Sequence, residues 1–137
     1  MIDRPPLRAD EILRRLVERG VDFVVVGGIA AVLHGSARNT FDLDISFATD
    51  EANLVALANV RASLCASLGE LDAKPRPPGA PPYTELRRNA DRYDLGGFNV
   101  SVASIDDLIA IKQAAGRAKD LLDVEELEAI KRLRHRR

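Results

Sequence analysis

Two aspartates, Asp42 and Asp44, are the residues of this chain with the clearest capacity for chemistry. They stand at alternate positions of the segment Asp42-Leu43-Asp44-Ile45, whose pattern is typical of a strand. Side chains at positions i and i+2 of a strand leave the same face, about 6–7 Å apart along the backbone. Carboxylate oxygens are ligands that divalent cations prefer, so the pair predicts a site for Mg²⁺ or Mn²⁺.

A glycine pair, Gly27-Gly28, precedes these aspartates and follows the apolar strand predicted over Val21–Val26. Glycines let the backbone turn sharply and approach a ligand closely. The short apolar stretch Ile29–Leu33 then predicts a helix, whose N-terminus would present unpaired backbone N–H groups at this turn. Such groups bind phosphate, so the turn and the carboxylates together predict a site for a phosphorylated ligand and its metal ion.

Three further residues could contact the phosphates of such a ligand. Arg38 and Thr40 lie in the polar loop between the short helix and the aspartate strand. Lys112 lies on the apolar face of a predicted helix, one turn after Leu108. An uncompensated ammonium is costly there, so Lys112 must reach solvent, face a ligand phosphate or pair with a carboxylate such as Asp42 or Asp44.

The remaining patterns predict the elements that position these residues. Helical periodicity and cap residues predict helices over Ala9–Arg19, from Asp50 to about Leu68, from Ile105 to Gly116, and over Lys119–Arg134. Asp91–Leu95 and Phe98–Val102, separated by Gly96-Gly97, predict a hairpin. Residues 69–82 hold five of the seven prolines and are predicted to be a loop. The order of elements predicts an α/β (α+β) fold, a small mixed sheet flanked by helices.

Length and composition predict one domain over residues 1–137. A formal net charge of −1 argues against broad, sequence-independent coating of nucleic acid. The single cysteine, Cys65, excludes an internal disulfide, and His34 is interpreted as a helix-terminal residue and not as a metal ligand. No signal peptide and no apolar run of about 20 residues is present, so we expect a cytoplasmic protein without a membrane segment.

These motifs resemble those of a known group of enzymes. Gly27-Gly28, thirteen intervening residues and then Asp42-Leu43-Asp44-Ile45 resemble the signature of the DNA polymerase β-type nucleotidyltransferase superfamily. The likeness is nearest to its small bacterial members, including proteins of toxin–antitoxin systems. The segments Val102–Lys112 and Arg117–Asp120 resemble the second half of those relatives, so the resemblance covers most of the chain.

The resemblance implies a nucleotidyltransferase fold that binds a nucleoside triphosphate and transfers its nucleoside monophosphate to a hydroxyl, with release of pyrophosphate. Asp42 and Asp44 would be the catalytic metal ligands, and Gly27 and Gly28 the residues of the phosphate turn. Arg38 would approach the triphosphate, and Lys112 would be a second cation near it.

The sequence departs from the superfamily pattern at one point. Active relatives add a third carboxylate on a later strand, and no such strand is evident here, so the sheet is expected to lack it. Asp72, Asp91 and Asp94 are the candidates to replace this carboxylate, with Asp94 the best placed because it lies in the hairpin.

Two function classes therefore stay open. The first is an enzyme that transfers the nucleotide to an RNA, a protein or a small molecule. The alternative is a catalytically weakened nucleotide-binding or regulatory component of a toxin–antitoxin pair. A missing strand would also leave a sheet edge uncovered, which predicts a homodimer or a dedicated partner protein.

Overall fold

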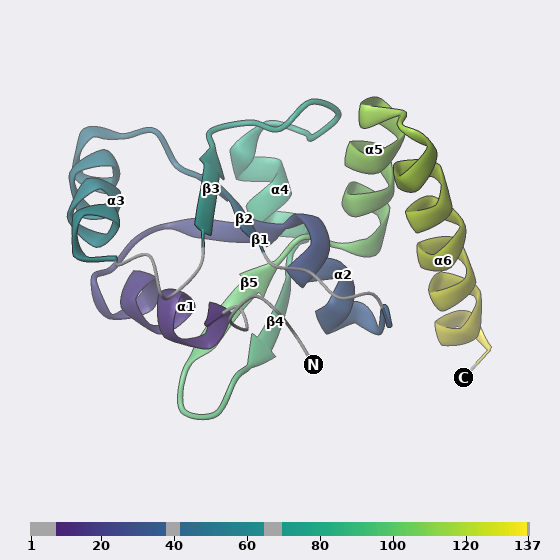
Figure 1. Cartoon of the computed structure of the whole chain (residues 1–137), viewed down its shortest axis with the longest axis horizontal. Helices are drawn as coiled ribbons and strands as arrows, with labels where there is room; N and C mark the ends of the chain where they lie inside the picture. Colours follow the sequence, from purple (N-terminus) through teal and green to yellow (C-terminus); the bar gives the residue numbers. More distant parts are fainter. Residues whose placement is uncertain (1–7, 38–41, 65–69, 137) are drawn as a thin grey trace, which may run out of the picture.

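The computed structural model describes residues 8–37, 42–64 and 70–136, without the side chains of Asp42 and Glu70 (Figure 1). Within these ranges the helices are α1 (Ala9–Glu18), α2 (Gly27–His34), α3 (Glu51–Ser63), α4 (Tyr83–Asn89), α5 (Ile105–Ala115) and α6 (Ala118–His135). The strands are β1 (Phe23–Val26), β2 (Asp42–Phe47), β3 (Glu70–Lys74), β4 (Asp91–Asp94) and β5 (Asn99–Val102). The predicted mixed α/β class is confirmed, as is the hairpin, which forms β4 and β5.

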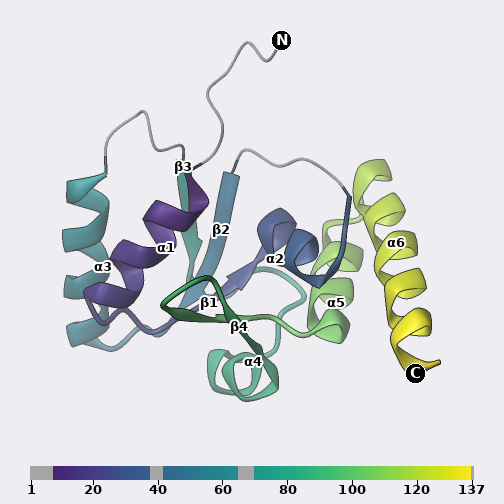
Figure 2. The same cartoon turned by 90° about the horizontal axis from the view of Figure 1, so that it is seen from below.

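The five strands form one mixed sheet in the order β3-β2-β1-β5-β4. β1 pairs antiparallel with β2 and parallel with β5, so it lies at the centre. All four of its residues are buried, which confirms the central strand that the run Phe23–Val26 predicts. Figure 2 shows α1 beside α3 at one end of the sheet, and α2, α5 and α6 at the other.

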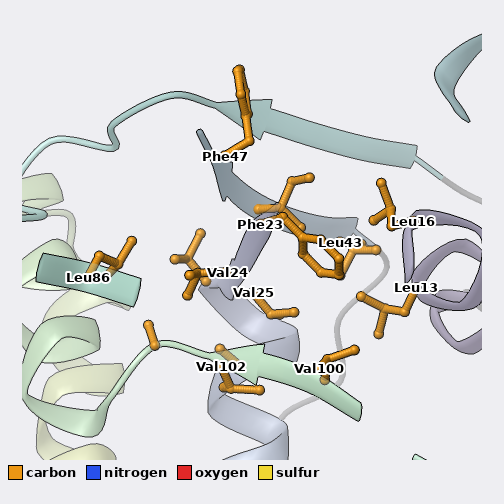
Figure 3. Packing of buried hydrophobic residues seen from close by; sticks show 14 of the residues in the cluster. Leu13, Leu16, Phe23, Val24, Val25, Leu43, Phe47, Leu86, Val100 and Val102 are labelled. Atoms are coloured by element: carbon orange, nitrogen blue, oxygen red, sulfur yellow. The ribbon is translucent and has the colours of Figure 1, made fainter. Parts of the chain in front are cut away.

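The two faces of the sheet differ in polarity along β2. Phe23 and Val25 of β1 pair with Phe47 and Ile45, so these apolar residues share one face. On the other face, Val26 pairs with Asp44. Figure 3 shows apolar side chains packed on both sides of β1, from α1 on one side and α4 on the other. The core is therefore continuous around β1, and polar side chains gather where β2 meets β3.

β3 corrects two predictions. The loop predicted over residues 69–82 is wrong in its first part, because Glu70–Lys74 is a strand parallel to β2. The sheet accordingly does not lack the strand that was expected to be missing. Only Leu71 and Ala73 of β3 share the apolar face, and charged residues alternate with them, so no apolar run marks this strand in the sequence. The prediction of a homodimer loses the argument from a missing strand, and a partner protein stays an expectation from the resemblance to toxin–antitoxin proteins.

Local cap signals are confirmed, whereas one helix is shorter than predicted. Asp50 Oδ2 accepts a hydrogen bond from the backbone N–H of Asn53 at 3.1 Å, and Ser104 Oγ accepts one from Asp107 at 3.2 Å. α3 ends at Ser63 and not near Leu68, because Leu64 is already in an extended conformation. Cys65 lies outside the described residues. No helix in the described ranges is long and apolar enough to cross a membrane.

The interpretation of His34 as a structural residue is confirmed. Its side chain is buried at the C-terminus of α2, where Nε2 lies 2.8 Å from the carbonyl oxygen of Ala103 and Nδ1 lies 3.0 Å from the hydroxyl of Tyr93. The carbonyl can only accept, so Nε2 carries the proton and Nδ1 accepts from Tyr93. Burial lowers the pKa of His34 and favours this neutral ring. The histidine thus ties α2 to β4 and to the β5–α5 connection.

Candidate functional site

A cleft of about 560 Å³ opens where β2 and β3 meet α5 and α6. Its walls come from the first turn of α2, β2, β3, the proline-rich loop that follows β3, the C-terminal half of α5 and the start of α6. The volume falls within the range of small-molecule sites, about 300–1,000 Å³. Its charged lining consists of four acidic and four basic side chains: Asp44, Asp72, Asp120, Asp123, Lys74, Lys112, Arg117 and Lys119.

Asp44 and Asp72 are direct neighbours in this cleft. β2 and β3 run parallel, and their register places Asp44 opposite Asp72. Neighbouring strands lie about 4.8 Å apart, so the two side chains leave the same face side by side. Two adjacent carboxylates present several oxygen ligands to one ion. The pair therefore has the chemistry of a site for a hard divalent cation.

The remaining predicted carboxylates have different positions. Asp42 begins β2 opposite Glu70, and neither side chain is among those described. The preference for Asp94 as the third carboxylate is wrong, because β4 lies at the far edge of the sheet and Asp94 accepts a hydrogen bond from Gly96 N–H at 2.9 Å. Asp91 lies 3.8 Å from the Nε2 of His34, outside the cleft. Asp72 is the candidate that the fold brings to Asp44.

The glycine turn at Gly27 lies against the side chain of Asp44. Gly27 starts α2 with a φ of +71°, a conformation that L side chains rarely adopt. A Cβ atom on Gly27 would lie 2.9 Å from the Cβ and the Cγ of Asp44. Gly28 lines the cleft next to it. The backbone at the start of α2 therefore lies directly against Asp44, and the sharp turn predicted at Gly27 is confirmed.

Replacing Gly27 by alanine should lower stability through two separate effects. The positive φ alone costs roughly 1–2 kcal/mol for a residue with a Cβ atom, and the contact with Asp44 adds to this cost. Gly20→Ala is a matched control, because Gly20 also has a φ of +71° but a Cβ atom there would meet no other atom within 4 Å. Urea unfolding should show a larger loss for Gly27→Ala than for Gly20→Ala. Equal losses would mean that Asp44 yields to the methyl group without cost.

Lys112 lines the cleft, but its partners differ from those expected. Its Nζ lies 3.0 Å from Asp123 Oδ2 and 3.6 Å from Asp120 Oδ1. The ion pairs described for Lys112 are with these two carboxylates and not with Asp44, whereas the side chain of Asp42 lies outside the described residues. Of the three alternatives for an ammonium on an apolar stripe, pairing with a carboxylate is the one observed. These partners lie on α6, which packs against α5.

Asp120, which the sequence indicates only as part of a charged turn after Gly116, is fully buried. Its Oδ2 accepts hydrogen bonds from Arg117 Nε at 2.6 Å and from the backbone N–H of Arg117 at 3.2 Å. Oδ1 accepts another from Arg117 Nη2 at 3.3 Å. These hydrogen bonds hold the pKa of Asp120 below its usual value, despite the opposing effect of burial. Asp120 thus anchors two cations of the cleft, Lys112 and Arg117.

Among the basic side chains that α5, α6 and the turn between them contribute to the cleft, Arg117 and Lys119 are more exposed than Lys112. The side chain of Arg117 is 64% exposed, against 17% for Lys112. Asp120 uses two of the five N–H donors of the Arg117 guanidinium, which leaves three for another ligand. Gly116, with a φ of +66°, makes the turn that brings these residues to the cleft. The turn was recognised in the sequence, but the burial of Asp120 depends on how α5 packs against α6.

The structure therefore gathers part of the predicted site. Gly27, Gly28, Asp44 and Lys112 line one cleft, whereas Arg38 and Thr40 lie outside the described residues. Among the side chains that the structure describes, no three carboxylates, histidines or cysteines are grouped closely enough to hold a metal ion by themselves. Mg²⁺ commonly uses one or two carboxylates and completes its coordination with water and substrate phosphates. Asp44 and Asp72 fit that pattern.

Comparison of the sequence with protein-family models and with curated proteins found no match.

Proposed function

We propose that this protein binds a nucleoside triphosphate with Mg²⁺ or Mn²⁺ in the cleft and transfers the nucleoside monophosphate to a hydroxyl acceptor. The observation that carries the proposal is the register pair Asp44–Asp72 beside the glycine turn. The two adjacent carboxylates can hold the metal ion. The helix N-terminus and the basic side chains of the cleft can bind the triphosphate. This combination supports phosphoryl-group chemistry better than the chemistry of any uncharged ligand.

Each part of the cleft has a role in this proposal. Asp44 and Asp72, together with Asp42, would hold the metal ion, which when bound neutralises charge on the triphosphate. The backbone at Gly27 and Gly28 would donate hydrogen bonds to phosphate oxygens. Arg117 would bind phosphate with the donors that Asp120 leaves free.

Asp72 would also act on the acceptor. The acceptor oxygen forms a bond to the α-phosphorus, and the bond from the α-phosphorus to the oxygen that bridges to the β-phosphate breaks. Pyrophosphate leaves with the electron pair of that bond, and the Asp72 carboxylate takes the hydroxyl proton. The alternative of a catalytically weakened protein depended on a missing third-carboxylate strand. With Asp72 opposite Asp44, we favour an active transferase over a protein that only binds nucleotides.

Ligand binding can be measured separately from transfer. Because only the folded state binds, saturating NTP and Mg²⁺ should stabilise the protein by about 2.7 kcal/mol at a hundred times the Kd. Asp42→Asn combined with Asp44→Asn should abolish this shift in a thermal unfolding experiment. Asp94→Asn, in β4, should retain it. A protein that none of the four NTPs stabilises would contradict the proposal.

Transfer is then tested with each α-labelled NTP, Mg²⁺ or Mn²⁺, and cellular RNA or protein as acceptor. Label in an acceptor, lost in the Asp44→Asn variant, is the expected result. NTP binding without transfer to any acceptor would instead support the alternative, a nucleotide-binding component of a toxin–antitoxin pair.

A further inference from the structure

One part of the cleft is apolar and has no role in the proposed binding of the phosphates or the metal ion. Among its apolar lining residues, five come from two elements that meet there: Pro77 and Pro78 of the loop after β3, and Ile111, Ala114 and Ala115 of α5. We call these five residues the apolar wall. None of their side chains carries a hydrogen-bond donor or acceptor. They line the same cleft as Asp44 and Asp72.

Hydrogen bonds hold the loop that supplies Pro77 and Pro78 at its start and at its tip. At its start, the hydroxyl of the buried Ser46 donates to the carbonyl of Pro75 at 2.8 Å, which ties the loop to β2. At its tip, Ala80 N–H donates to the carbonyl of Pro77 at 3.0 Å, and Arg76 Nε donates to the carbonyl of Ala80 at 3.0 Å. The prolines also restrict their own φ angles. This part of the wall is therefore preformed.

Gly79 fixes the loop against α5. It has a φ of +86°, and a Cβ atom there would lie 2.6 Å from the carbonyl oxygen of Ala110 and 2.7 Å from the Cβ of Ala114. The loop and the helix are thus in direct contact along one turn of α5. The wall is continuous across the two elements, and binding a ligand against it needs no ordering of the chain.

We propose that the apolar wall binds the nucleobase of the nucleoside triphosphate. The inference rests on the proposed function. A nucleoside triphosphate joins a charged phosphate chain to a flat, weakly polar base, and this cleft joins charged groups to an apolar surface in the same way. Ala115 stands only two residues before Arg117, so the apolar wall adjoins the cations proposed for the phosphates.

The test separates the base from the phosphates. Ala115 is exposed on the cleft side of α5, and Ala115→Leu would fill the space beside the wall without lowering helix propensity much. Affinities for an NTP and for inorganic tripolyphosphate, each with Mg²⁺, are measured by calorimetry on the full chain. Ala58→Leu is the matched control, because Ala58 is an exposed residue of α3 outside the cleft.

Ala115→Leu should weaken NTP binding about tenfold or more and leave tripolyphosphate binding unchanged, while Ala58→Leu affects neither. Unchanged NTP affinity, or equal losses for NTP and tripolyphosphate, would overturn the inference. Normal NTP affinity with reduced transfer would also overturn it, because the wall would then hold the acceptor. If wild type binds neither NTP nor tripolyphosphate, the proposed function itself fails.

Discussion

Asp72→Asn should lower nucleotide transfer by about 10²–10⁴-fold, the usual range for the loss of one general base. The amide keeps the size of the side chain but cannot take the proton of the acceptor hydroxyl. The fold should tolerate the change, because the Asp72 side chain is half-exposed and its Oδ2 lies 3.8 Å from Lys74 Nζ, too far for a strong ion pair. Transfer of an α-labelled nucleotide at saturating NTP measures the effect.

Asp94→Asn is the control for this result. It is the same change on another strand of the same sheet, and it should leave transfer unaffected because β4 lies at the far edge from β3. The amide oxygen of the new side chain would still be able to accept the hydrogen bond from Gly96 N–H. Loss of transfer in Asp94→Asn, with full activity in Asp72→Asn, would assign the third carboxylate to β4 and contradict the role proposed for Asp72.

Asp120→Asn should be among the most destabilising single changes in the cleft. Each hydrogen bond between charged groups contributes about 1.5–3 kcal/mol, and Asp120 accepts from Arg117 while also facing Lys112. An amide would remove the negative charge that these cations share. Urea unfolding at neutral pH should therefore show a loss of about 2 kcal/mol or more. Asp106→Asn is the control, because Asp106 pairs with Lys131 at 2.6 Å on the surface and should change stability little.

The effect of Asp120 should depend on pH in a defined direction. Its folded-state pKa lies below the unfolded value of about 3.9. Its contribution to stability is therefore complete above that value and is lost as the pH falls through the folded-state pKa. The difference in unfolding free energy between wild type and Asp120→Asn should shrink below about pH 4. A difference that stays constant between pH 7 and pH 3 would mean that the charge of Asp120 does not stabilise the fold.

The sequence by itself determined the elements whose patterns are local. The apolar run Phe23–Val26 marks a central strand, and Asp50 and Ser104 mark the starts of α3 and α5. Each of these signals depends on neighbours within a few positions, which the sequence shows directly. Two residues of the cleft, Gly27 and Asp44, could be predicted in the same way. Gly27 lies at a sharp turn between two such elements, and Asp44 lies on a strand.

Only the tertiary structure decided that Asp72 is the carboxylate opposite Asp44 and that Asp120 is buried. β3 is an edge strand whose charged residues alternate with Leu71 and Ala73, so its pattern resembles a polar loop until β2 pairs with it. The register that sets Asp72 opposite Asp44 links residues far apart in the chain, and no local pattern encodes it. Likewise, the stretch from Gly116 to Asp120 predicts an exposed charged turn. Packing of α6 against α5 buries Asp120 there, because Arg117 and Lys112 compensate its charge.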